Sequence, residues 1–138
     1  MAQTIIVDTG VLLALLSARD QHHKWAVEKA SGLALPWATC EAVLSETYHR
    51  ISPSPNARAG LLAMVRRGAL CFPFALPPAL GDLAGFLEKY ADLPTSLADA
   101  NLVLMADRIP KALIWTTDSD FTVYRLGGSR SLRVLLPD

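Results

Sequence analysis

The chain has 138 residues, of which 51% are hydrophobic, so it can bury a core of ordinary size. Thirteen basic and thirteen acidic residues give a formal net charge of zero, so the overall field does not indicate a nucleic-acid-binding protein. The apolar run Val11–Leu16 is short and follows Asp8, so we expect neither a signal peptide nor a membrane span. Cys40 and Cys71 lack the C-x-x-C spacing of a zinc or redox site, and we expect both to be reduced. We expect one cytoplasmic domain over residues 1–138.

Any site for an anionic partner must therefore be local. The stretch 49–67 carries one histidine and four arginines without an acidic residue: His49, Arg50, Arg58, Arg66 and Arg67. A solvated helical face is the simpler interpretation of these charges. The stretch alone does not predict a binding surface.

The first half of the chain alternates short apolar runs with helical stretches. Residues 3–8 form a β-branched apolar run that predicts a strand buried on both faces, with Asp8 at its carboxyl end. The next expected elements, in chain order, are a helix opening at Val11–Leu16, a helix around 21–30, a weak strand at Leu33–Leu35 ended by Pro36, and a helix over Cys40–Ile51.

The second half repeats this alternation. Ser54 and Pro55 have the residue types of an N-cap and a first helical position, so a helix is expected to about Arg67, with Gly68 after it. Ser96 is expected to cap a later helix that places Asp99 in its first turn. The remaining expected elements are a short strand at Leu70–Phe72, a helix from Pro77 to about Tyr90, a helix over Leu97–Arg108, and strands at Leu113–Trp115 and Leu132–Leu136.

Strands of this length that alternate with helices predict βαβ units, hence a mainly parallel sheet with helices on both faces. Ligand sites in such sheets lie beyond the carboxyl ends of the strands. Asp8 and Asp118 both follow expected buried strands, so they are expected to lie at that edge of the sheet.

Two further acidic residues lie in apolar surroundings, Glu46 and Asp99. Burying carboxylates is costly unless another charge offsets theirs, and no lysine or arginine adjoins any of the four in sequence. A hard divalent cation with oxygen ligands is a natural partner for such a set. Any one of these residues taken alone is equally well explained as a helix cap or a turn residue.

Four segments together resemble the motifs of one known family. The segment Ile-Ile-Val-Asp-Thr-Gly-Val-Leu-Leu around Asp8 resembles the opening motif of PIN domains, and Ala-Val-Leu-Ser-Glu-Thr around Glu46 resembles their second. Ser-Leu-Ala-Asp-Ala-Asn-Leu around Asp99 resembles the third, and Thr-Thr-Asp-Ser-Asp-Phe around Asp118 the fourth. The motifs run in order from residue 4 to about residue 124, and the resemblance is closest to VapC-type toxins of toxin–antitoxin modules.

The resemblance implies a three-layer α/β/α fold and a Mg²⁺- or Mn²⁺-dependent endoribonuclease, with RNA as substrate. It also implies a homodimer and a cognate antitoxin protein as partner. Carried over by position, Asp8, Glu46, Asp99 and Asp118 would be the catalytic and metal-binding carboxylates. Asp120 would be a fifth metal ligand, and the hydroxyls of Thr9 and Thr116 would support the ligands.

The residues leave three alternatives open. One is a PIN fold that has lost catalysis and acts as an RNA-binding or scaffold protein, and another is a regulatory α/β module that binds Mg²⁺. The third assigns general-base or metal chemistry to His22, His23 or His49, although adjacent helical residues such as His22 and His23 cannot easily share one ion. Trp25 is a candidate for stacking on bases, whereas Trp115 is expected in the core.

Overall fold

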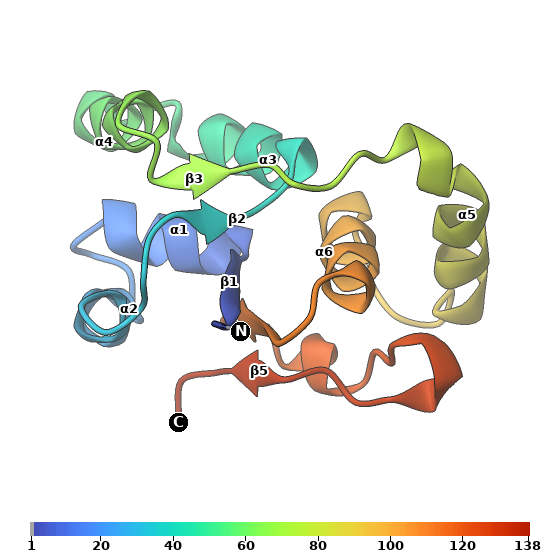
Figure 1. Ribbon diagram of the computed structural model, residues 1–138. Coiled ribbons are helices and arrows are strands. Elements are labelled where there is room, and N and C mark those ends of the chain that lie inside the picture. The colour runs from blue at the N-terminus through green and yellow to red at the C-terminus, as the bar shows by residue number, and fades with distance from the viewer. Residues whose placement is uncertain (1) are drawn as a thin grey trace.

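The computed structural model describes residues 2–138 as a sheet between two layers of helices (Figure 1). The strand order is β3-β2-β1-β4-β5, and each neighbouring pair of strands is parallel. The predicted three-layer α/β/α fold with a mainly parallel sheet is therefore confirmed. Met1, included in the expected domain, lies outside the described residues. The strands are β1 (Thr4–Val7), β2 (Trp37–Ala38), β3 (Leu70–Cys71), β4 (Ala112–Trp115) and β5 (Val134–Leu135).

The helices lie on both sides of this sheet. In Figure 1, α2 and α4 lie to its left and α5 and α6 to its right, and α3 contacts both α1 and α6. None of the helices in residues 2–138 has the length and apolar character needed to cross a lipid bilayer. The helices of the described chain are α1 (Thr9–Leu16), α2 (His23–Ala30), α3 (Glu41–Ile51), α4 (Pro55–Arg66), α5 (Leu80–Lys89) and α6 (Leu97–Arg108), and its short 3-10 turns are η1 (Pro77–Ala79), η2 (Ser119–Thr122) and η3 (Gly127–Ser129).

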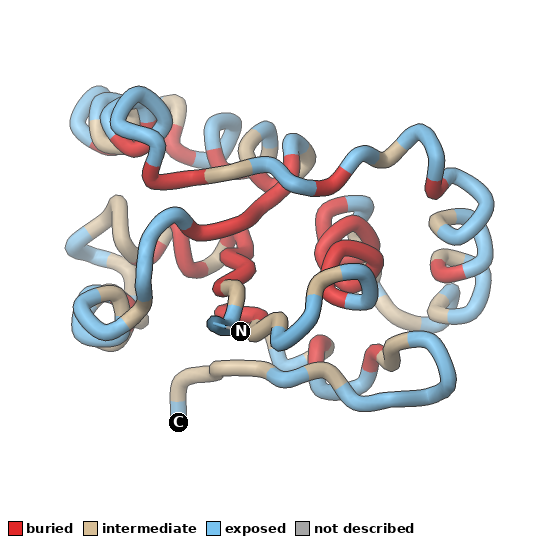
Figure 2. Tube along the Cα trace, in the orientation of Figure 1, coloured by how far each residue is buried: buried red, intermediate tan, exposed pale blue. Residues whose placement is uncertain are grey.

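Strand β1 is at the centre of the core. It pairs with β2 through Ile6 and with β4 along its whole length, so Val7 lies opposite Trp115. Ile6, Val7 and Trp115 are completely buried, as the continuous apolar run 3–8 predicts for a central parallel strand. Figure 2 shows buried backbone along β1, β2 and most of α6. The carboxyl ends of β1 and β4 therefore lie next to each other and are fixed by the most buried part of the molecule.

Three tryptophans meet beside this sheet. The ring of Trp115 has its centroid 5.0 Å from that of Trp37 and 6.3 Å from that of Trp25, both edge to face. Trp37 and Trp115 are buried, and Trp25 is half-buried against Trp115. Such packing explains these residues as core, including Trp25, for which base stacking was an alternative.

The predicted strand Leu33–Leu35 is wrong, because the second strand starts after Pro36. Leu35 is 55% exposed, whereas Trp37 is 6% exposed and its backbone N–H donates to the carbonyl of Ala69 at 2.8 Å. Burial of the tryptophan thus decides where the chain joins the sheet. The predicted helix from Pro77 likewise begins as the 3-10 turn η1 and becomes α-helical only at Leu80.

The caps predicted from sequence are present. The hydroxyl of Ser54 accepts from the backbone N of Ala57 at 3.2 Å at the start of α4. After α4 the chain turns at Gly68 with φ of 73°, a left-handed conformation that favours glycine. These local signals set the ends of α4 as expected.

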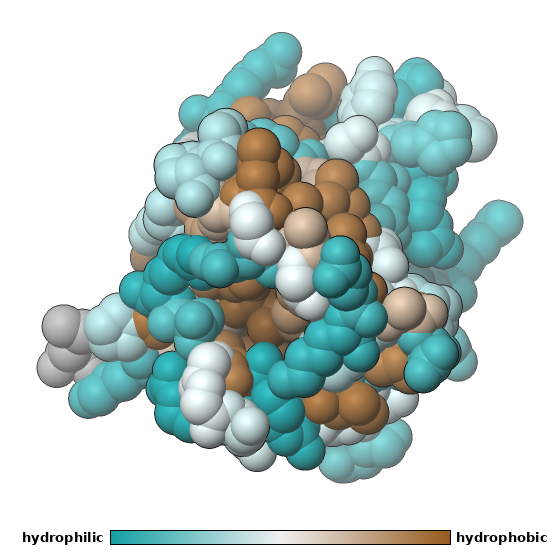
Figure 3. Space-filling view, turned by 90° about the vertical axis from the view of Figure 1, so that its right-hand side faces the viewer, coloured by the Kyte–Doolittle hydropathy of each residue, from teal (hydrophilic) through white to brown (hydrophobic). Residues whose placement is uncertain are grey.

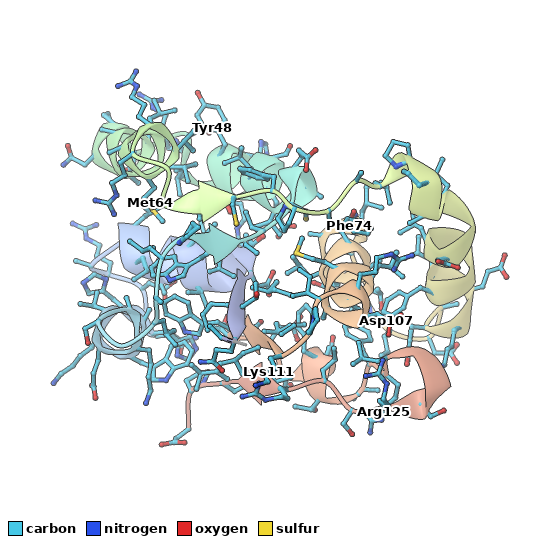
Figure 4. The ribbon with its side chains drawn as sticks, viewed as in Figure 1. Tyr48, Met64, Phe74, Asp107, Lys111 and Arg125 are labelled. Atoms are coloured by element: carbon cyan, nitrogen blue, oxygen red, sulfur yellow. The ribbon has the colours of Figure 1, made fainter. Side chains whose placement is uncertain are left out.

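Helix α5 forms the outermost layer on its side of the molecule. On the side of the molecule where α5 lies, hydrophobic residues line a central hollow that hydrophilic side chains surround (Figure 3). Phe74 lies in the segment that leads from β3 to α5 (Figure 4) and is buried. The guanidinium of Arg108 on α6 lies 5.6 Å from the ring centroid of Phe74. Arg108 also bonds Asp82 at 2.7 Å and so joins α6 to α5.

Candidate active site

A pocket of about 260 Å³ lies beyond the carboxyl ends of β1 and β4. The four carboxylates predicted from the sequence all line it, although they come from four separate segments: Asp8, Glu46, Asp99 and Asp118. Its other lining residues are Thr9, Gly10, Arg50, Pro94, Ser96 and Thr117. The predicted convergence of the four acids on one pocket is therefore present in the structure.

Asp8 is the most constrained of the four. It follows β1, caps α1 by accepting from the backbone N of Thr9 at 2.7 Å, and is 6% exposed. Burial raises the pKa of its carboxyl to about 6, the hydrogen bonds from Thr116 and Thr9 oppose that rise, and the nearby charges of Asp99 and Asp118 add to it. Burial is thus the main cause of the raised pKa, and repulsion from the other site carboxylates adds to it.

Thr116 connects Asp8 to Asp118. Its hydroxyl donates to Oδ2 of Asp8 at 2.7 Å and accepts from the backbone N of Asp118 at 2.9 Å, and Thr116 is completely buried. Asp118 then accepts from the backbone N of Asp120 at 2.9 Å and so caps the turn η2. Thr116, predicted as a supporting residue, therefore fixes the relative positions of Asp8 and Asp118, the carboxylates that follow β1 and β4.

Asp99 is held from two sides. Its backbone N donates to the hydroxyl of Ser96 at 3.0 Å, which is the predicted N-cap of α6. Its Oδ2 accepts from the hydroxyl of Tyr124 at 3.1 Å, and that hydroxyl also lies 3.0 Å from Oγ1 of Thr95. Burial, followed by the charge of Asp118, raises the pKa of Asp99 above its ordinary value. Burial also raises the pKa of Tyr124, so the phenol keeps its proton and acts as the donor.

Glu46 and Arg50 lie one helical turn apart on α3 and both line the pocket. Among the described residues, Arg50 forms neither an ion pair nor a side-chain hydrogen bond. Arg50 is thus the cationic side chain at the edge of an otherwise acidic pocket. Its guanidinium is free to meet an anionic group.

The donor set fits a hard divalent cation. All four carboxylates supply oxygen, and Thr9, another lining residue, has a buried hydroxyl oxygen that lacks a hydrogen-bond partner in the described chain. Within residues 2–138, no three histidine, cysteine or acidic side chains are grouped closely enough to hold an ion as they stand. Mg²⁺ commonly uses only one or two carboxylates and completes its shell with water and substrate oxygens. A pocket wider than a single ion is consistent with that mode of binding.

Asp120 and the histidines take no part in lining this pocket. Asp120 contributes its backbone N to Asp118, as described above, and its side chain is half-buried. His23 lies at the start of α2, where Nδ1 is 2.7 Å from the carbonyl of Ala14. These positions leave the carboxylates as the chemical groups of the site.

The sequence did not predict Tyr124, Thr95 or Arg50 as parts of the site. Tyr124 is the fourth residue after Asp120 and follows the short turn η2, so no strand or helix periodicity indicates its direction. Arg50 carried a usable indication, because its spacing of four from Glu46 places both on one face of a helix.

Comparisons with known proteins agree with this geometry. The family model described as PIN domain matches residues 5–126, a range that contains all four pocket carboxylates and Asp120. No curated protein sequence gives a significant match. Among solved structures, the chain is similar to the crystal structure of Mycobacterium tuberculosis VapC20, described as a sarcin-ricin loop cleaving toxin. The TM-score is 0.73 at 20% identity, over 87% of this chain and 94% of that one, which is a likeness of fold. Since the PIN family model matches most of the length of this chain, the chain belongs to the PIN domain family.

Proposed function

We propose that the protein is an endoribonuclease of the VapC type that hydrolyses RNA phosphodiester bonds with Mg²⁺ or Mn²⁺. The observation that carries the proposal is the arrangement of Asp8, Glu46, Asp99 and Asp118 around one pocket in a chain of the PIN family. The likeness of fold to a toxin described as cleaving the sarcin-ricin loop supports RNA as the substrate class.

The four carboxylates would hold the cation, and the backbone N–H of Asp120 would keep Asp118 in place by donating to its carboxylate. Thr116 orients Asp8 and Asp118, and Tyr124 orients Asp99, so the oxygen donors are placed before any ligand binds. Bound Mg²⁺ or Mn²⁺ supplies charge stabilisation at the phosphoryl oxygens and lowers the pKa of water. One carboxylate of the set accepts the proton of the attacking water, which is the role that such groups take in general-base catalysis.

Two partners follow from the same proposal. We expect a cognate antitoxin protein, because VapC-type nucleases act in toxin–antitoxin pairs. We also expect a homodimer, since zero net charge gives little electrostatic resistance to association and several large apolar side chains are exposed, among them Leu35 and Leu80 at 55% each. Light scattering across a concentration series tests the dimer directly.

The experiment that tests the activity is Mn²⁺-dependent cleavage of a mixed RNA pool by the purified protein. We expect cleavage with Mn²⁺ or Mg²⁺, no cleavage with EDTA, and no cleavage by Asp118→Asn. The matched control is Glu88→Gln, which removes one carboxylate from the exposed face of α5 away from the pocket and should cleave like wild type. Equal cleavage in EDTA and Mn²⁺ would contradict the proposed metal dependence.

A PIN fold that has lost catalysis predicts a different result in the cleavage assay. Such a protein would bind RNA and leave it intact at every metal concentration. The presence of all four pocket carboxylates favours the nuclease, because like charges gathered around one pocket, two of them buried, destabilise a fold that makes no use of them.

A further inference from the structure

A second cavity shares a lining residue with the acidic pocket. It is a groove of about 710 Å³ between the end of α1, the end of α3 and the start of α4. Arg50 lines both the groove and the acidic pocket, so the two cavities meet at this one side chain. A polymer that extends from the acidic pocket past Arg50 would therefore reach the groove.

The groove differs from the pocket in charge. Its charged lining residues are Arg19, Arg50 and Asp20, whereas the pocket has four carboxylates and Arg50. Asp20 is already engaged locally, because its Oδ1 accepts from the backbone N of His22 at 2.8 Å. With two cations against one anion, the groove carries a net positive charge beside an anionic site.

The two groove arginines are free to meet a ligand. Five other arginines are engaged within the protein; Arg108, for example, bonds Asp82, and Arg130 bonds Asp107. Arg66 at the end of α4 and Arg67 after it also have no side-chain partner in the described chain, but they line neither cavity. Among the described residues, Arg19 and Arg50 have neither an ion pair nor a side-chain hydrogen bond, and both are exposed. Guanidinium groups of this kind suit phosphate oxygens, which they can contact through two parallel hydrogen bonds.

The floor of the groove suits the other part of a nucleotide. Leu13 and Leu16 of α1 line it with half-buried apolar surface, and Asn56 at the start of α4 adds an amide without a side-chain partner in the described chain. Apolar surface accepts the face of an unstacked base, while amide groups can bond base or sugar edges. A single RNA strand presents phosphates and unstacked bases together, so it matches both the arginines and the apolar surface of this groove.

We propose that this groove binds the single-stranded RNA that flanks the cleaved bond, with Arg50 and Arg19 contacting successive phosphates on one side of the acidic pocket. The inference rests on the proposed nuclease function for the identity of the ligand. It assigns to Arg50 and Arg19 the phosphate contacts that the neutral net charge of the chain does not reveal.

The test is binding of a fluorescent single-stranded oligoribonucleotide in EDTA, measured by anisotropy across a salt series. The variant Arg19→Ala/Arg50→Ala should raise Kd at least about tenfold, the loss expected for two charge-assisted contacts. The slope of log Kd against log salt should also fall by about 1.4, since each phosphate contact on a single strand contributes about 0.7. A merely structural effect of the substitutions would leave that slope unchanged.

The matched control is Arg66→Ala/Arg67→Ala, which removes the same charge from exposed positions that line neither cavity. It should bind RNA within about twofold of wild type. An equal loss in both variants would show a general effect of charge and overturn the proposal. Wild-type RNA binding by Arg19→Ala/Arg50→Ala together with lost binding of a partner protein would also overturn it, because the groove would then belong to that partner.

The binding measurement is separate from cleavage. If the wild-type protein fails to cleave RNA with Mn²⁺ yet binds it through the two arginines, the proposed function is wrong and the groove proposal stands. If it cleaves RNA and the double variant binds as wild type, the groove proposal is wrong and the function stands.

Discussion

The hydroxyl of Thr116 donates a hydrogen bond of 2.7 Å to Oδ2 of Asp8, a residue 108 positions earlier in the chain. The bond joins the ends of β4 and β1, and the same hydroxyl accepts from the backbone N of Asp118. Two carboxylates of the site therefore depend on one buried oxygen.

Replacing Thr116 by valine should weaken both the fold and the activity. Valine has nearly the same shape but lacks the hydroxyl, so Asp8 loses a donor and the N–H of Asp118 loses its acceptor. We expect the free energy of unfolding to fall by about 1–3 kcal/mol, as for buried hydrogen-bonding groups left without partners. Urea denaturation measures the change, and Thr116→Ser, which keeps the hydroxyl, should retain most of the stability and cleavage. Wild-type activity in the valine variant would show that the bond does not position the site.

Tyr124→Phe should lower the affinity for Mn²⁺ while leaving the aromatic packing in place. The ring of Tyr124 packs against Phe86, Tyr90 and Phe121, with centroids 5.0–5.3 Å away, and phenylalanine preserves those contacts. The hydroxyl that holds Asp99 is lost, so we expect affinity for Mn²⁺ to fall by roughly tenfold, the lower end for residues that orient metal ligands. Titration calorimetry gives the affinity without using activity.

The control for this variant is Tyr90→Phe in the same aromatic cluster. The hydroxyl of Tyr90 accepts from the backbone N of Arg125 at 2.9 Å, so its loss also removes a hydrogen bond, although Tyr90 does not line the acidic pocket. Both variants should lose some stability, and only Tyr124→Phe should lose Mn²⁺ affinity. Equal affinities in the two would contradict a positioning role for Tyr124.

The pKa of Asp8 predicts how the stability of the metal-free protein depends on pH. The carboxyl has a pKa of about 6 in the folded protein against 3.8 as its ordinary value, so the folded state binds more protons between these values. Stability from this group is fully present below about pH 4 and is lost as the pH rises through about 6, by about 3 kcal/mol in total. Urea denaturation in EDTA from about pH 4.5 to about pH 7.5 should show this fall, and Asp8→Asn should reduce it.

The strand-end acids were predictable because one physical rule places them. Parallel strands that alternate with helices bring their carboxyl ends to one edge of the sheet. Two buried apolar runs, one followed by Asp8 and the other by Asp118, are therefore enough to indicate a shared site. The cap at Ser96 likewise fixes Asp99 in the first turn of α6 from local sequence alone. These predictions rest on signals within a few residues.

The supporting contacts were not predictable because they join distant segments. The bond from Tyr124 to Asp99 spans 25 positions and depends on how the segment after η2 packs against α6. Strand β2 has only two residues, too few for a periodic pattern, and the burial of Trp37 against Trp115 decides its register. Tertiary packing rather than local preference sets both features.

The charge of Asp99 is unfavourable in the metal-free protein. Burial and the charge of Asp118 raise its pKa, so the ionised form is less favourable in the folded state than in the unfolded one. Asparagine removes the charge, and its carbonyl oxygen can still accept the hydrogen bond from Tyr124. We therefore expect Asp99→Asn to be at least as stable as wild type at neutral pH in EDTA, and the difference to vanish in acid, where the wild-type carboxyl is protonated.

The same variant should lose RNA cleavage and gain less stability from Mn²⁺, because a cation that binds the folded state more weakly stabilises it less. Thermal melts of both proteins in EDTA and in Mn²⁺ separate this from a structural role. A residue that mainly served the start of α6 would cost about 1 kcal/mol when changed and would leave the Mn²⁺ response intact. If Asp99→Asn melts well below wild type in EDTA and responds equally to Mn²⁺, Asp99 is structural. Melting at or above wild type with a reduced response would place its carboxylate among the metal ligands, since removing a charge that the fold disfavours and the cation requires has both effects at once.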